Sequence, residues 1–169
     1  MLLDKLFRET SPGRDNPTWS FFTKLIVGKD NPLGPMLIRY RLIQSPHGSL
    51  YVHHHLRPDA DRDVHDHPWW FCTFVLRGGY VEEFRPKRHK FDLVWRRAFG
   101  YSWHNRFHRM SLQSAHKIVY VKPNTWTLLV VSKKKQEWGF WVQGPAHIQS
   151  SFVPWRQYSA NGTPDPMDS

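Results

Sequence analysis

The stretch Val64-His65-Asp66-His67-Pro68-Trp69-Trp70-Phe71-Cys72-Thr73-Phe74-Val75-Leu76-Arg77-Gly78-Gly79-Tyr80 contains the signals that decide the fold of this chain. It opens with two histidines one residue apart, continues into an apolar run from Phe71 to Arg77, and ends in a Gly-Gly turn. In an extended segment, side chains two residues apart point to the same side, so His65 and His67 can direct two imidazoles at one point. An apolar run followed by such a turn is typical of a β-hairpin. The stretch therefore predicts buried strands that follow two ligands of a metal site.

The rest of the composition agrees with strands that are joined by short turns. The chain has 169 residues, enough for one domain with a hydrophobic core, and no repeat or linker divides it. Nine tryptophans favour strands or a lined pocket, and thirteen prolines with ten glycines favour turns over long helices. From residue 36 the apolar residues Ile38, Tyr40 and Leu42 alternate with Arg39 and Arg41. This period of two predicts an all-β sandwich or small barrel, with both arginines facing outward.

The two ends of the chain are expected to differ from this barrel. Asp15-Asn16-Pro17 has the residues of a helix start, and the apolar residues after it recur at helical spacing up to Gly28. We therefore predict a helical segment over residues 1–35 that packs on a barrel over residues 36–158. Residues 159–169 are small, polar and proline-containing, which predicts a disordered tail.

A third metal ligand must come from elsewhere in the chain. His108 is the first candidate, because it lies at the start of a predicted strand about forty residues after the pair. His104 is its main rival, and His53 and His55, which share one face of a strand, stay open as alternatives. Three imidazoles leave open coordination positions for water, oxygen or substrate. The single cysteine, Cys72, excludes both a thiolate zinc site and an internal disulfide.

The spacing of these residues resembles the two-part metal motif of the cupin superfamily, in which a His-x-His pair precedes an apolar strand and a glycine, and a further histidine follows. Over roughly residues 36–145, the chain is similar to a family of small bacterial and phage cupins. The segments that carry this similarity are His65-Asp66-His67-Pro68-Trp69, Leu76-Arg77-Gly78-Gly79-Tyr80, Phe107-His108-Arg109, Trp126-Thr127-Leu128, Trp138-Gly139-Phe140-Trp141 and Val153-Pro154-Trp155. The resemblance implies a double-stranded β-helix, the jelly-roll barrel of cupins, with the metal in its mouth. It implies a fold rather than a reaction, since that family has no assigned reaction.

The chain departs from the general cupin motif at its glutamate. That motif has Glu four or five residues after the second histidine, where this chain has Phe71 and Cys72, so a carboxylate ligand would have to reach in from Glu82 or Glu83. Thiol dioxygenases of the superfamily resemble this variant, since they hold Fe(II) with three histidines. The mammalian-type cysteine dioxygenase has a cysteine at about the place of Cys72. The resemblance implies a mononuclear Fe(II)-type dioxygenase, although zinc, nickel and manganese also bind histidine. A purely structural role for Cys72, as a small buried apolar residue, stays open.

Five further side chains are candidates for the pocket or for orienting the metal ligands. Asp66 can accept a hydrogen bond from a ligand or hold the loop between the two histidines. Arg57 and Arg109 can bind an anionic group of a small substrate. Cys72 and Tyr80 belong to the two predicted strands of the hairpin.

The charge and the missing motifs limit the function classes. The net charge is +10, which permits nucleic acid as a partner but does not favour it, because no nucleic-acid motif accompanies the charge. The chain has no Walker A loop, no GxSxG and no HExxH. The alternatives to an oxygenase are a metal-assisted isomerase or hydrolase, and a non-catalytic basic cupin that binds a ligand, nucleic acid or partner protein.

No apolar run is long enough for a bilayer, and the N-terminus lacks a secretory signal, so we expect a cytoplasmic protein. A homodimer through edge strands stays open.

Overall fold

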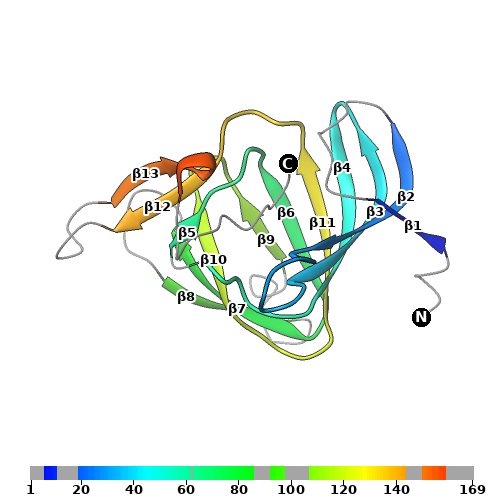
Figure 1. Ribbon diagram of the computed structural model, residues 1–169, viewed down its shortest axis with the longest axis horizontal. Coiled ribbons are helices and arrows are strands. Elements are labelled where there is room, and N and C mark those ends of the chain that lie inside the picture. The colour runs from blue at the N-terminus through cyan, green and yellow to red at the C-terminus, as the bar shows by residue number, and fades with distance from the viewer. Residues whose placement is uncertain are drawn as a thin grey trace.

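The computed structural model describes residues 6–10, 19–61, 63–85, 92–97, 107–143 and 150–158, which form two β-sheets (Figure 1). In spatial order, the seven-stranded sheet contains β1 (Arg8–Glu9), β2 (Ser20–Val27), β3 (Leu37–Ser45), β4 (Gly48–His55), β11 (Thr125–Ser132), β6 (Phe71–Arg77) and β9 (Phe107–Met110). The six-stranded sheet contains β13 (Ser150–Pro154), β12 (Gly139–Gln143), β5 (Val64–His65), β10 (Ala115–Val121), β7 (Gly79–Arg85) and β8 (Asp92–Arg97). A 3-10 turn, η3 (Trp155–Gln157), follows β13. Within these ranges no helix has the length and apolar character that a membrane crossing requires.

The strand pairing is that of a jelly roll. Three antiparallel pairs are nested along the chain: β4 with β11, β5 with β10, and β6 with β9. The chain therefore forms a long antiparallel ribbon, and this ribbon passes from one sheet to the other, because β4 and β6 lie in the seven-stranded sheet and β5 lies in the six-stranded sheet. Such a ribbon, wound over two sheets, defines the jelly roll. The predicted all-β jelly-roll barrel is confirmed.

Buried apolar residues on the inner faces of the two sheets form separate clusters. Along β6 and β11 buried and less buried residues alternate, as the period of a strand requires. One cluster contains Phe71 and Leu129, and another contains Tyr80 and Ile118. All four of these residues also line one cavity. The core is thus divided by a cavity between the sheets, rather than filled throughout.

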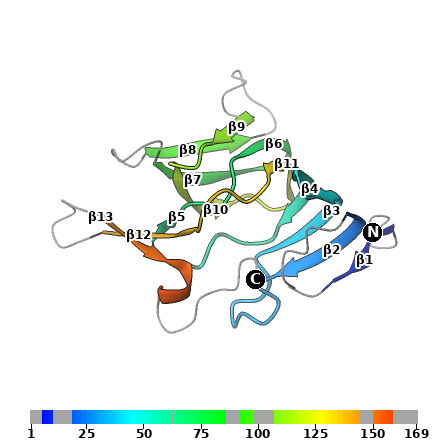
Figure 2. The ribbon, with the colours of Figure 1, turned by 90° about the horizontal axis from the view of Figure 1, so that it is seen from above.

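The predicted N-terminal helical segment is wrong where the structure describes it. Residues 20–27 form strand β2, which pairs antiparallel with β3, and Figure 2 shows β1, β2 and β3 together on the side of the molecule opposite β12 and β13. Leu25 and Val27 are buried two residues apart, so the apolar residues fit a strand as well as a helix. The β-branched and aromatic content of Ser20–Val27 favours the strand once β3 offers an edge. The predicted helix start at Asp15-Asn16-Pro17 and the predicted tail over residues 159–169 lie outside the described residues.

Gly78, in the turn between β6 and β7, provides a prediction about stability. Its φ is +73°, and a Cβ there would lie 2.8 Å from Cα of Thr125. The hydroxyl of Thr125 accepts a hydrogen bond from the Gly79 amide at 3.0 Å, so the turn cannot move away freely. We expect Gly78→Ala to lower the free energy of unfolding by about 2–3 kcal/mol, from backbone strain of roughly 1–2 kcal/mol and the steric conflict.

Urea unfolding measures this loss, and Gly34→Ala is the matched control. Gly34 has a similar φ of +78°, but a Cβ there would meet nothing within 4 Å. Its substitution by alanine should therefore lower the free energy of unfolding only by the backbone strain, about 1 kcal/mol. Equal losses at the two glycines would contradict a steric role for Thr125.

Candidate metal centre

Strand pairing brings three histidines to one point. His65 lies in the two-residue strand β5, directly opposite His116 of β10. Residues opposite each other on antiparallel strands project their side chains to the same face, and His67 reaches that face two residues further along the chain. The nitrogen atoms that the three rings offer lie within 4.8 Å of one another. His67 Nε2 and His116 Nε2 are 3.0 Å apart.

Of the predicted ligands, the structure brings His65 and His67 together and adds His116. His108 lies in β9, opposite Thr73 of β6, in the seven-stranded sheet. The side chain of His108 and the whole of His104 lie outside the described part of the chain. His116, which lies near the start of β10, was not among the ligands considered from the sequence. His116 and Ile118 are both buried and two residues apart, and a period-two pattern begun at His116 would have found it.

A buried carboxylate fixes the orientation of His116. Glu82 of β7 is 0% exposed, and its Oε1 accepts a hydrogen bond from Arg96 Nε of β8 at 2.5 Å. Its Oε2 lies 2.9 Å from Nδ1 of His116. Because Glu82 is paired with an arginine it is ionised, so it can only accept, and Nδ1 of His116 must carry the proton. The lone pair of His116 is then on Nε2, which faces His67. This arrangement of carboxylate and histidine is the usual support of a metal-bound imidazole.

The geometry of the three rings fits a metal ion. Two nitrogens bound at about 2.1 Å, at a right angle around a metal, are about 3.0 Å apart, which is the separation of His67 Nε2 and His116 Nε2. Nδ1 of His65 is buried without a hydrogen-bond partner in the described part of the chain, and lies 4.0 Å from Asp61 Oδ2. Burial, followed by neighbouring histidines, lowers the pKa values of His65 and His67 well below the usual value. Both rings are therefore neutral near pH 7, which is the form that binds metals.

The three histidines lie in the wall of a cavity with a volume of about 90 Å³. A single water needs roughly 10–15 Å³ measured in this way, so the cavity has room for an ion with waters or for a small molecule. His53 and His55 also line it, as do apolar side chains from both sheets. These apolar lining residues are Met36, Leu37, Pro68, Trp69, Phe71, Ile118, Leu129 and Trp138. The cavity is thus mostly apolar with convergent polar groups, as small-molecule sites are.

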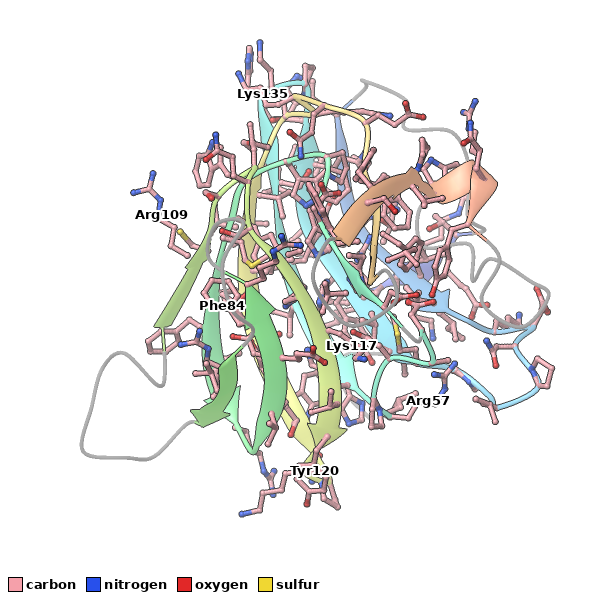
Figure 3. The ribbon with its side chains drawn as sticks, turned by 90° about the vertical axis from the view of Figure 1, so that its left-hand side faces the viewer. Arg57, Phe84, Arg109, Lys117, Tyr120 and Lys135 are labelled. Carbon is pink, nitrogen blue, oxygen red and sulfur yellow. The ribbon has the colours of Figure 1, made fainter. Side chains whose placement is uncertain are left out.

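Of the five further candidates, Tyr80 is the one that lines this cavity. Cys72 lies on the outer face of β6, between the inward residues Phe71 and Thr73, and burial raises the pKa of its thiol. The position that corresponds to the cysteine of cysteine dioxygenase therefore faces away from the histidines. Arg109 is exposed on β9, and Figure 3 shows it extending outward.

The other two candidates, Asp66 and Arg57, form hydrogen bonds that fix loops. Asp66 is buried, and burial raises its pKa to about 6. Its Oδ1 accepts a hydrogen bond from the Gly139 amide at 2.9 Å, and its own amide donates to the Gly139 carbonyl at 3.0 Å. The residue between the two histidines is thereby fixed to β12, which agrees with one of its two predicted roles. Arg57 donates to the carbonyl oxygens of Gly34 and Pro58, both at 3.0 Å.

Arg39 corrects the expectation that both arginines of its strand face outward. It is 7% exposed, lines the cavity, and donates from Nε to His53 Nε2 at 3.1 Å. The alternation was misleading because both faces of β3 are covered. On the opposite face Tyr40 packs against Phe7 and Trp126, so it is buried too.

The buried His53 and His55 predict a loss of stability in acid. Burial, then His54, His116 and Arg39, lowers the pKa of His55 from 6.5 to about 4, and burial followed by Arg39 lowers that of His53. His55 has a pKa of 6.5 in the unfolded chain and about 4 in the folded chain, so between these values the unfolded chain binds more protons than the folded chain. The free energy of unfolding is therefore highest above pH 6.5 and falls as the pH drops towards 4, by up to about 3 kcal/mol for His55.

Urea unfolding of metal-free protein between pH 7.5 and 4.5 measures this slope. His55→Gln keeps a partner for the hydroxyl of Thr127, which lies 3.2 Å from His55 Nε2, but cannot titrate. The variant should show a shallower slope than the unsubstituted chain. An unchanged slope would contradict a neutral, buried His55.

Comparison with known proteins finds likeness in structure alone. No family model matches the chain, and no curated protein matches it in sequence. Among solved structures it is similar to the capsular polysaccharide assembling protein CapF from Staphylococcus aureus, with a TM-score of 0.46 and 15% identity over 70% of this chain and 32% of that one. It is similar to KdgF from Halomonas sp., with a TM-score of 0.46 and 12% identity over 69% of this chain and 96% of that one.

A third similar structure is a cupin-2 domain from Rhodospirillum rubrum, with a TM-score of 0.47 and 14% identity over 81% of this chain and 84% of that one. The chain spans about a third of the length of CapF. Its own strand pairing defines its fold, with β4, β5 and β6 nested against β11, β10 and β9. Three histidines are grouped in the cavity between the two sheets of this jelly roll, where they can hold a metal ion.

Proposed function

We propose that this chain is a metal-dependent enzyme, with one divalent ion on His65, His67 and His116 and a small-molecule substrate in the adjoining cavity. One observation carries the proposal: three imidazoles converge in a cavity wall, and a buried carboxylate orients one of them. A purely structural metal site has four protein ligands, whereas three protein ligands leave positions for reactants. The reaction we propose is an Fe(II)-type oxygenation.

The residues around the site suit this role. Three neutral ligands leave the full double charge of a bound Fe(II) ion uncompensated, and such an ion supplies oxygen activation or Lewis-acid chemistry. Phe71 and Leu129 keep bulk water from one side of the cavity, while Tyr80 and Thr127 offer hydroxyl groups to a polar substrate. Glu82 holds the proton of His116 at Nδ1, so that Nε2 stays available as a ligand.

The same cavity favours a second candidate, a metal-assisted isomerase or hydrolase that needs no oxygen. His53 and His55 line it and are neutral near pH 7, because burial lowers both pKa values. A neutral imidazole is a base that can accept a proton from a substrate. This candidate shares the metal site and differs in the co-reactant.

Metal analysis followed by oxygen measurements tests the proposal. The chain is purified without chelator, its metal content is measured, and the metal-free chain is titrated anaerobically with Fe(II), Mn(II), Co(II), Ni(II) and Zn(II). We expect a single equivalent to bind, and the Fe(II) protein to consume oxygen when a substrate is present. Turnover of a substrate without oxygen uptake would support the isomerase or hydrolase instead. A chain that retains none of these ions would overturn both candidates.

A further inference from the structure

Arg39 places a permanent positive charge inside the cavity. It lies on β3, opposite His53 of β4, and its guanidinium lies 5.1 Å from the centre of the Tyr51 ring. Its Nε donates to His53 Nε2, which accepts because burial and Arg39 together keep that ring neutral. A guanidinium has five N–H donors and stays protonated at any ordinary pH. The hydrogen bond from Nε to His53 fixes one edge of the planar guanidinium group and thereby its orientation.

The other ionisable groups of the cavity make its charge positive. Apart from histidines and Tyr80, the described lining residues that ionise are Arg39, Lys134 and Asp59. The carboxylate of Asp59 accepts a hydrogen bond from the Ile118 amide at 2.7 Å, and burial raises its pKa. Lys134 is exposed and follows β11, so it lies where the cavity meets solvent. A metal on the three histidines would add two further positive charges, and the complementary ligand is an anion.

The planar geometry of the Arg39 guanidinium determines which kind of anion fits it best. A guanidinium fork matches the two oxygens of a planar carboxylate. A phosphate dianion carries a second charge and a third oxygen, for which the described cavity wall offers no second buried lysine or arginine, and Asp59 opposes it. The volume of about 90 Å³ and the mostly apolar wall suit a small organic acid.

We propose that Arg39 forms a carboxylate-binding subsite, and that the substrate of this cavity is a small carboxylic acid. Arg39 holds the carboxylate while His53 fixes the guanidinium, and the remainder of the acid extends into the cavity towards the three histidines. Lys134 raises the local concentration of anions at the entrance. The statement about the substrate rests on the proposed function, whereas the subsite itself rests on Arg39 alone.

Binding of propionate, compared with the neutral propionamide, tests the subsite without requiring catalysis. The indole N–H signals of Trp69 and Trp138, which line the cavity, report occupancy in a ¹H–¹⁵N titration of the metal-free chain. We expect propionate to bind at least about tenfold more tightly than propionamide. Loss of a charge-assisted hydrogen bond should make Arg39→Gln bind propionate about 10- to 100-fold more weakly. Arg39→Lys should recover part of the affinity.

Arg41→Gln is the matched control, because Arg41 lies on the same strand and does not line the cavity. It should bind propionate as the unsubstituted chain does. Equal affinity for propionate and propionamide, measured on the unsubstituted chain, would overturn the subsite even if Arg39→Gln failed to fold. Tighter binding of methylphosphonate than of propionate would overturn the choice of carboxylate.

The same titrations separate the two proposals. If no metal binds but propionate affinity depends on Arg39, the subsite stands and the metal enzyme does not. If metal binds to His65, His67 and His116 but propionate affinity is the same in Arg39→Gln, the metal site stands and the carboxylate subsite is wrong.

Discussion

Alanine at His116 is expected to lower metal affinity on the order of a hundredfold or more, while alanine at His108 should leave it unchanged. Removing a residue that only supports a ligand costs about 10- to 100-fold in affinity, and removing the ligand itself should cost more. His116 contributes Nε2, which lies 3.0 Å from Nε2 of His67. His108 lies in the seven-stranded sheet, whereas His65 and His116 pair within the other sheet.

Competition with a coloured chelator, on anaerobically prepared Co(II) protein, measures both affinities. His65→Ala provides the positive control, since it removes the residue directly opposite His116. Circular dichroism of the metal-free variants shows whether each chain still folds. A large loss in His108→Ala, with none in His116→Ala, would show that the ligand set predicted from the sequence is the better one.

The sequence was sufficient for the fold class and for recognising the pair of His65 and His67, which the structure places beside His116. Period-two alternation is a local signal, and a His-x-His pair in an extended segment needs no partner to be noticed. The hairpin predicted at the Gly-Gly turn is wrong, because β6 and β7 lie in different sheets. The third histidine is different, because strand register decides which distant residue lies opposite His65. His108 and His116 both lie on strands, and only the pairing of β5 with β10 distinguishes them.

The wrong predictions have the same physical origin. The apolar residues of Ser20–Val27 fit both a helix and a strand, and the edge of β3 decides between them. Arg39 was expected to face outward because Tyr40 looks like the core side of its strand. Tyr40 is indeed buried, but under Phe7 and Trp126 on the other face of the sheet. In both cases the deciding contact comes from a segment distant in sequence.

Replacing Glu82 with alanine is expected to lower the free energy of unfolding by about 3–5 kcal/mol, because it leaves the buried charge of Arg96 without its carboxylate. Metal affinity should fall by about 10- to 100-fold as well, because Nδ1 of His116 loses the acceptor that fixes its proton. Urea unfolding of the metal-free chain and the chelator competition measure the two effects separately.

Glu83→Ala is the control for position and charge. Glu83 is the next residue of β7, and its carboxylate lies 3.4 Å from Lys117 Nζ, where both side chains are partly exposed. Pairs of this kind contribute about 0–1 kcal/mol, and Glu83 contacts no metal ligand in any described interaction. Its alanine variant should therefore change stability little and metal affinity not at all.

The double variant Glu82→Met with Arg96→Met separates stability from ligand orientation. Replacing both members of a buried ion pair with apolar side chains is often neutral or stabilising, so the free energy of unfolding should largely recover. Metal affinity should not recover, because methionine cannot hold the proton on Nδ1 of His116. If affinity returned together with stability, Glu82 would act only by keeping the hairpin of β7 and β8 folded. If affinity stayed low in a stable chain, the carboxylate would be the group that prepares His116 to bind the metal.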